Sequence, residues 1–132
     1  MVDALIGTWK LETSENFEEL LKELGVNMVL RKAATATKPN AEISKNGDEW
    51  TIRSVSTLKT TEIKFKIGEE FEETRADNSK GKSTFIIDGD KLKQVSEKDG
   101  KQYSTVREIV GGKLKVTVTI GNIVCTRVYS KV

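Results

Sequence analysis

The stretch "KLKQVSEKDGKQYSTVREIVGGKLKVTVTIGNIVCTRVYSK", residues 91–131, decides the fold because turn signals interrupt it at regular intervals. Two-residue pairs suited to positive φ stand at 99–100 (DG), 111–112 (GG) and 121–122 (GN), and another DG stands at 88–89. Successive pairs lie 11, 12 and 10 residues apart. Such pairs close tight hairpins, and the segments between them alternate as strands do. This half of the chain is therefore predicted to be an antiparallel meander.

Strand-like segments also run through the first half of the chain. They are IGTWKLE (6–12), NAEISK (40–45), DEWTIRSVST (48–57), LKTTEIKFKI (58–67) and EEFEET (69–74). Together with STFII (83–87) and the segments above, they predict about ten strands joined as antiparallel neighbours. A barrel of more than eight strands begins to enclose a cavity. Only 6% of the residues are aromatic, so there are few large side chains to fill that interior. The prediction is an all-β chain, a single domain over 1–132, forming a hollow ten-stranded antiparallel up-and-down β-barrel.

Two short helices are predicted to interrupt this pattern. In NFEELLKELG (16–25) the spacing i, i+3, i+4, i+7 is occupied by apolar residues, namely Phe17, Leu20, Leu21 and Leu24. Asn16 is expected to cap this helix with Glu19 in a capping box, and Gly25 to end it. NMVLRKAATAT (27–37) is predicted to be a second helix, capped by Asn27 and stopped by Pro39. DNA-binding helix–turn–helix units normally sit in small helical domains, so this pair is expected to cover part of the barrel.

The composition excludes several classes of function. Net charge is +2, from 22 lysines and arginines against 20 aspartates and glutamates, which is too even for a nucleic-acid-binding protein. The chain has no histidine, so the commonest general base and metal ligand is missing. A lone cysteine, Cys125, excludes an internal disulfide and a multi-cysteine metal site. No metal and no cofactor are expected, and the absence of a signal or membrane-spanning segment indicates a cytoplasmic protein.

Two arginines occupy unexpected positions in the last strands. Arg127 shares one side of its segment with Ile123, Cys125 and Tyr129, and Arg107 shares its side with apolar and hydroxyl residues. If these arginines face solvent, they merely interrupt the pattern. If they face inward they need an anion, because an unpaired buried charge is very costly. No carboxylate stands on the same side of either segment, so that anion is expected to come from outside the protein.

Several motifs together resemble the intracellular lipid-binding proteins, the cytosolic fatty-acid-binding and cellular retinoic-acid-binding proteins. They are GTWKLETSENFEELLKEL (7–24), LGVNMVLRKA (24–33), STLKTTEIKF (56–65), GEEFEETRAD (68–77), TVRE (105–108) and VCTRVYSKV (124–132). The resemblance covers essentially the whole chain. It implies a β-clam of the lipocalin-like, or calycin, class with a helix–turn–helix cap. It further implies a monomer that holds a single lipid in its interior.

The resemblance also implies roles for particular residues. Arg107, Arg127 and Tyr129 match the positions that hold the ligand carboxylate. The entrance and cavity positions are matched by Phe17, Leu21, Met28, Ala34, Leu58, Ala76 and Asp77. For Phe17 and Leu21, ordinary packing of the helix on the barrel is an equally good interpretation.

A basic trio on the cap matches one that some relatives use for ligand-dependent nuclear import, namely Lys22, Arg31 and Lys32. Basic residues on an amphipathic cap also favour transient contact with an anionic membrane, which would make the cap a membrane-facing surface. The alternative interpretation of the trio is a solvated helix face.

The function that these observations favour is a non-catalytic carrier of one long-chain fatty acid anion, acting in the cytoplasm with possible import into the nucleus. Retinoic-acid binding is the alternative. SENFEELLKELGVN (14–27) favours it, whereas the segment 98–108 lacks the extra residues that retinoid binders carry. Two other classes are an enzyme built in the cavity and a protein-interaction module without a ligand. Native mass spectrometry separates the carrier from these two classes. An intact lipid indicates a carrier, an altered lipid indicates an enzyme, and an empty barrel indicates an interaction module.

Overall fold

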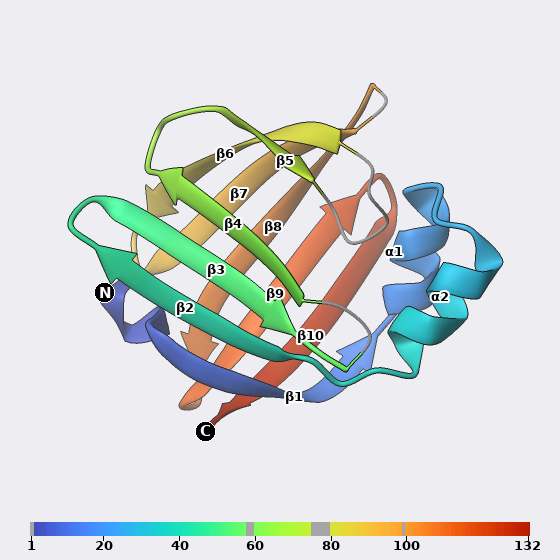
Figure 1. The fold of residues 1–132 in the computed structure, drawn as a ribbon, viewed down its shortest axis with the longest axis horizontal. Helices are drawn as coiled ribbons and strands as arrows, with labels where there is room; N and C mark the ends of the chain where they lie inside the picture. The colour runs from blue at the N-terminus through green and yellow to red at the C-terminus, as the bar shows by residue number, and fades with distance from the viewer. Residues whose placement is uncertain (1, 58–59, 75–79, 99) are drawn as a thin grey trace.

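The computed structural model describes residues 2–57, 60–74, 80–98 and 100–132. Within these residues the chain forms ten strands, two α-helices and a short 3-10 helix, which confirms the predicted architecture (Figure 1). In chain order they are η1 (Val2–Leu5), β1 (Gly7–Glu15), α1 (Phe17–Glu23), α2 (Met28–Thr35), β2 (Asn40–Asn46), β3 (Glu49–Val55), β4 (Thr60–Lys66), β5 (Phe71–Thr74), β6 (Lys80–Asp88), β7 (Lys91–Lys98), β8 (Lys101–Val110), β9 (Lys113–Ile120) and β10 (Ile123–Lys131).

The strands form a single sheet in the order β4-β3-β2-β1-β10-β9-β8-β7-β6-β5. All its pairings are antiparallel, and β1 joins the two halves by pairing with both β2 and β10. The GG pair closes the hairpin between β8 and β9 with φ of 60° at Gly111 and 78° at Gly112. Two successive positive φ values are the requirement of the type I′ turn, which matches the twist of the flanking strands. The turn signals therefore predicted the order of the strands correctly.

The two ends of the strand order, β4 and β5, share no hydrogen-bonded ladder among the described residues. Aromatic side chains connect them instead. The ring of Phe65 on β4 stacks on Phe85 of β6 with centroids 3.6 Å apart, and it lies 6.1 Å from Phe71 of β5. One backbone bond supports this stack, because the Gly68 N–H donates to the Phe85 carbonyl over 2.8 Å. Side-chain packing thus closes the barrel where backbone pairing does not.

The short helix η1, which the sequence analysis did not predict, lies at the end of the barrel away from α1 and α2 (Figure 1). Its Leu5 is completely buried, and the Leu5 carbonyl accepts a hydrogen bond of 2.9 Å from the Trp9 indole. This end of the barrel is therefore packed solid around Leu5 and Trp9. Any opening to the interior has to lie elsewhere.

Helix α1 packs through Leu20 against Ile120 of β9 and Cys125 of β10. Asn16 occupies the N-cap position of α1 as predicted, but its side chain does not cap the helix. Asn16 adopts the left-handed conformation at φ 60°, makes no side-chain cap and donates from Nδ2 to the Val124 carbonyl over 3.0 Å. The capping box with Glu19 therefore lacks the hydrogen bond from the backbone N–H of α1 to the Asn16 side chain, because that side chain bonds to β10 instead. The predicted cap of α2 is confirmed, since Asn27 Oδ1 accepts from the Leu30 N–H over 3.0 Å.

The aromatic closure makes a prediction for stability. Replacing Phe85, which is fully buried, by alanine removes the ring that stacks on Phe65, and should lower the free energy of unfolding by about 3–5 kcal/mol. The control is Ile86→Ala on the same strand, at a side chain that is 41% exposed, which should cost less than about 1 kcal/mol. Urea unfolding followed by tryptophan fluorescence measures both. Equal losses for the two variants would contradict the closure role of Phe85.

Candidate functional site

The two arginines singled out from the sequence lie in one row of the sheet. Val116 of β9 is paired with Arg127 of β10 on one side and with Arg107 of β8 on the other. Neighbouring strands are about 4.8 Å apart, so the two backbones are separated by roughly 10 Å. Tyr129 is buried and lies two residues from Arg127, on the same side of β10. The sheet thus brings together the three residues predicted to bind a carboxylate.

Arg107 is held within the barrel by its neighbours. Its Nη1 donates to Gln94 Oε1 over 2.9 Å, and its guanidinium carbon lies 5.6 Å from the centroid of the Phe85 ring. Burial lowers the pKa of the Arg107 guanidinium, while Tyr129 and Glu73 act in the opposite direction. Arg107 therefore already has an acceptor and an aromatic face in the absence of ligand.

Arg127 differs from Arg107 because its Nε has no acceptor among the described residues. Its guanidinium carbon stands 3.9 Å from the centroid of the Phe17 ring on α1, a close cation–π contact. Its Nε atom is buried and, within the described part of the chain, has no hydrogen-bond partner. A buried donor without an acceptor typically costs about 1–3 kcal/mol, so this position favours an acceptor supplied by a ligand.

A carboxylate from a strand that carries neither arginine comes near Arg107. Glu73 of β5 accepts through Oε1 from Ser83 Oγ over 2.5 Å and from Gln94 Nε2 over 3.4 Å. Gln94 in turn accepts from Arg107, so one amide separates the two charges. The pattern within the arginine strands did not indicate this neighbour, and the binding of an anion from outside the protein stays a prediction. Glu73 reaches the network from another strand of the same barrel.

A cleft of about 440 Å³ leads from the surface to Arg127. It lies between the end of β1 and the two helices, and its lining includes Leu11, Phe17, Thr35 and Lys38. Negative groups also line it, namely Glu12, Glu18 and Glu19. Of the three residues predicted to bind a carboxylate, Arg127 is the one that lines this cleft.

The predicted entrance residues differ in how far their side chains are buried. Phe17 is half-buried over Arg127, and Leu21 and Ala34 are also half-buried. Leu20, rather than Leu21, belongs to the cluster that packs α1 on the barrel. Met28 is 62% exposed. The remaining three predictions, Leu58, Ala76 and Asp77, lie outside the described residues.

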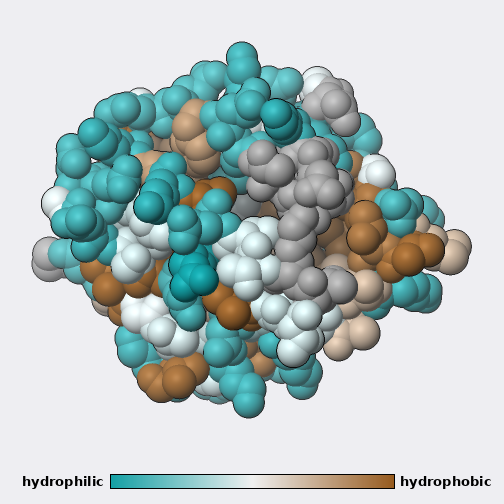
Figure 2. Space-filling model, in the orientation of Figure 1, coloured by the Kyte–Doolittle hydropathy of each residue, from teal (hydrophilic) through white to brown (hydrophobic). Residues whose placement is uncertain are grey.

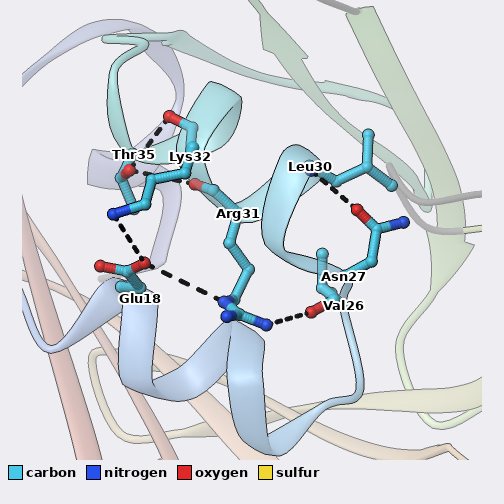
Figure 3. Close-up of polar contacts among 7 residues, drawn as sticks. All are labelled: Glu18, Val26, Asn27, Leu30, Arg31, Lys32 and Thr35. Atoms are coloured by element: carbon cyan, nitrogen blue, oxygen red, sulfur yellow. Dashed lines mark hydrogen bonds and ion pairs between the residues drawn. The ribbon is translucent and has the colours of Figure 1, made fainter.

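The basic trio on the cap is divided by its contacts, as Figure 3 shows for Arg31 and Lys32. The Arg31 side chain is only 16% exposed, its Nη1 donates to the Val26 carbonyl over 2.7 Å, and its Nε lies 4.0 Å from Glu18 of α1. Lys32 is exposed and lies 3.9 Å from the same carboxylate. Arg31 therefore connects the two helices, while Lys22 and Lys32 are exposed. Nuclear import through this trio stays a prediction.

The sequence analysis did not recognise the role of Lys98. This side chain is only 6% exposed, and its Nζ donates to the carbonyl of Leu24, the last residue of α1's C-terminal turn, over 2.6 Å. Lys101 donates to the neighbouring Glu23 carbonyl over 2.8 Å. Cations at the C-terminus of a helix satisfy its free carbonyls and interact favourably with its dipole. No sequence signal indicated this contact, because 74 residues separate its two partners.

Other kinds of site receive no support from the described residues. They contain no group of three or more histidine, cysteine, aspartate or glutamate side chains placed to hold a metal ion. None of their helices is long and apolar enough to cross a membrane. Cys125 is a free and buried thiol, and burial raises its pKa although Arg127 acts in the opposite direction. A thiol with a raised pKa is a poor nucleophile at neutral pH.

Comparisons with known proteins agree with this geometry. The model of the lipocalin / cytosolic fatty-acid binding protein family matches residues 6–132. The fatty acid transporter REP1-NXSQ is 42% identical with a TM-score of 0.94, over 98% of this chain and 97% of its own. Fatty-acid-binding protein 1 of Echinococcus granulosus is 38% identical with a TM-score of 0.95, over 98% of each chain. The Schistosoma mansoni fatty acid binding protein, in complex with arachidonic acid, is 32% identical with a TM-score of 0.95, over 99% and 98%.

The contact between Lys98 and α1 makes a prediction for the cap. Lys98→Met removes the bond to the Leu24 carbonyl, so the end of α1 should open more often. Because hydrogen bonds to charged groups contribute about 1.5–3 kcal/mol, amide exchange at Leu24 and Gly25 should accelerate roughly tenfold or more. Hydrogen exchange followed by NMR measures this, with Lys91→Met, a half-exposed lysine of the same strand that pairs with Glu108, as the matched control with unchanged exchange. Unchanged protection in Lys98→Met would show that Lys98 does not hold the cap.

Proposed function

The chain belongs to the lipocalin / cytosolic fatty-acid binding protein family, and from this premise we propose that it is a non-catalytic carrier of one long-chain fatty acid anion. The carboxylate binds Arg127 and Tyr129, with Arg107 beside them, and the acyl chain occupies the barrel interior. The protein works as a monomer in the cytoplasm. The similar proteins named as fatty acid transporter and fatty-acid-binding proteins support the ligand class.

The observation that carries this proposal is the buried Nε of Arg127, which has no acceptor in the described part of the protein. A guanidinium offers a planar fork of donors that matches a carboxylate, and the Tyr129 hydroxyl can donate one more hydrogen bond. A fatty acid brings both the acceptor that Arg127 lacks and a tail that requires an apolar interior. A neutral lipid brings only the tail.

The affinity follows from both parts of the ligand. Burying a tail of about fifteen methylene groups gains roughly 12 kcal/mol at ~0.8 kcal/mol each. Loss of translational freedom and ordering of the chain take back a large part of that gain. Micromolar to nanomolar binding corresponds to about 8–12 kcal/mol, so the contacts to the carboxylate need to supply only the remainder. The tail therefore supplies most of the affinity, and the arginines supply the head-group specificity.

Retinoic acid is the second candidate, because the same trio would bind its carboxylate and SENFEELLKELGVN resembles the retinoid group. Displacement of a fluorescent fatty acid by oleate and by retinoic acid ranks the two ligands. We expect oleate to displace the probe more effectively. Displacement by retinoic acid at a concentration more than tenfold lower would reverse the assignment.

The exposed side of the cap supports delivery of the ligand at a membrane. Three consecutive apolar side chains of α2 are exposed, Met28 at 62%, Val29 at 79% and Leu30 at 37%. Figure 2 shows hydrophobic residues gathered at the end of the molecule where α1 and α2 lie. With Lys22 and Lys32 nearby, this surface suits a bilayer with anionic head groups.

Val29→Asp should reduce the rate of ligand transfer to anionic vesicles without changing the affinity for the ligand. An unchanged transfer rate would exclude this surface.

The carboxylate assignment makes the sharpest prediction. Arg127→Ala should weaken binding of palmitate by about 1.5–3 kcal/mol, because it removes charge-assisted hydrogen bonds. Binding of hexadecanol, which has the same tail and no charge, should change much less. Tyr129→Phe should cost less, about 1 kcal/mol, because it removes one donor and keeps the ring. Isothermal titration calorimetry with both ligands measures these differences.

The matched control is Arg53→Ala, which removes an arginine from β3 that pairs with the carboxylates of Glu42 and Glu62 and is well exposed. It should leave the affinity for both ligands unchanged. Equal weakening of acid and alcohol in Arg127→Ala would mean that Arg127 has a structural role, and the carboxylate assignment would then fail.

A further inference from the structure

The polar side chains around Glu73 form a network with a defined direction. Ser83 gives its hydroxyl proton to Glu73, so in the 2.7 Å contact between Ser83 and Ser96 the donor has to be Ser96. The amide of Gln94 donates to Ser83 over 3.2 Å and to Glu73 over 3.4 Å. Its carbonyl oxygen accepts from Arg107. All donors therefore point away from Arg107 and toward the Glu73 carboxylate.

This network is enclosed by the barrel. Ser83, Ser96 and Gln94 are all buried, and they come from β6 and β7. In such surroundings a fully satisfied network is rigid and electrostatic interactions are stronger than in water. Glu73 thus faces Arg107 across one amide in a place where its negative charge is felt strongly. The pKa of Arg107 agrees with this proximity, because burial lowers it and the charge of Glu73 acts to raise it.

The charges that the described residues place on this part of the inner wall can then be counted. Arg107 and Arg127 contribute two positive charges to one row of the sheet, and Glu73 contributes one negative charge beside Arg107. Lys98 of β7 is also buried, but it lies six residues from Leu92, the residue paired with Arg107, which is roughly 20 Å along the strand. It contacts the cap instead, through the Leu24 carbonyl, and is not part of this group of charges. One ligand carboxylate therefore balances the net positive charge that remains on the two arginines and Glu73. A head group with two negative charges leaves one of them unbalanced in a buried site, which is costly.

We propose that Glu73 is a specificity-determining residue that restricts the site to lipids with one negative charge at the head group. This inference rests on the proposed function, because it concerns the charge of the ligand that the carrier accepts. Glu73 does not itself attract the anionic ligand, because both are negatively charged. It acts by neutralising part of the arginine charge in advance, so that the second charge of a malonate or phosphate head group finds no counterpart.

The test compares palmitate with hexadecylmalonate, a lipid with a similar tail and two carboxylates at one end, at pH 8 where both are ionised. Wild-type protein should bind palmitate more tightly. Glu73→Gln keeps the shape and removes the charge, so the preference for palmitate should fall about tenfold, a shift expected from one nearby half-buried charge. Because the same two ligands are compared in each variant, the larger size of the malonate head group cancels.

Two further variants control this comparison. Glu72→Gln removes the same charge from the neighbouring residue of β5, whose exposed side chain pairs with Lys80 over 4.0 Å, and should leave the preference unchanged. Glu73→Asp keeps the charge and should retain most of the preference, even if the shorter side chain lowers stability. Thermal unfolding of each variant without ligand shows that it is folded.

The outcomes separate the two proposals. An unchanged preference in Glu73→Gln, or an equal loss in Glu72→Gln, would overturn the role of Glu73 while leaving the carrier function intact. Failure of wild-type protein to bind palmitate would overturn the proposed function and this inference with it. A tenfold fall confined to Glu73→Gln would establish the charge balance.

Discussion

The charge of Arg107 on the inner wall is the constraint on which much of the structure depends. A guanidinium in the interior of a barrel is stable only where acceptors and counter-charges surround it. Gln94 supplies the acceptor, Phe85 supplies an aromatic face, and Glu73 supplies the opposite charge through the Gln94 amide. These contacts join β5, β6, β7 and β8. The same network that stabilises the arginine therefore holds together the strands on one side of the unpaired seam.

The seam between β4 and β5 and the helical cap are both held by side chains rather than by backbone ladders. Stacking of Phe65 on Phe85 closes the seam from within, and Lys98 and Asn16 attach α1 to the strands beneath it. Regions held by a few separate contacts open at lower free energy than a continuous ladder. A carrier needs such regions, because its ligand has to pass between the interior and solvent while the rest of the barrel stays folded.

The two arginines have different parts in this arrangement. Arg107 is satisfied within the protein, whereas Arg127 rests on the Phe17 ring with a buried donor unused. In the proposed function a carboxylate gains most at Arg127, whose buried Nε has no partner among the described residues, and less at Arg107, where it competes with Gln94. The contact between Arg127 and Phe17 also means that the proposed head-group position adjoins the cap. Occupation of the site and the position of α1 are therefore expected to influence one another.

Turn signals and periodicity predicted the number and order of the strands and the two helices, whereas for the arginines they left open whether the side chains face solvent or the interior. These features depend on local rules: positive φ at the turns, a period of two in strands and a period near four in helices. The row that contains Arg107 and Arg127 follows from hairpin register alone, because only β9 lies between them.

Only the tertiary structure decided which distant groups meet. Glu73 reaches Gln94 from another strand, Lys98 reaches Leu24 across 74 positions, and Asn16 leaves its expected cap for the Val124 carbonyl. Periodicity assigns each side chain to a face of the sheet, but it does not say which segment lies opposite that face once the sheet has curved. That depends on the curvature of the barrel and on the placement of the cap, and both result from packing the whole chain.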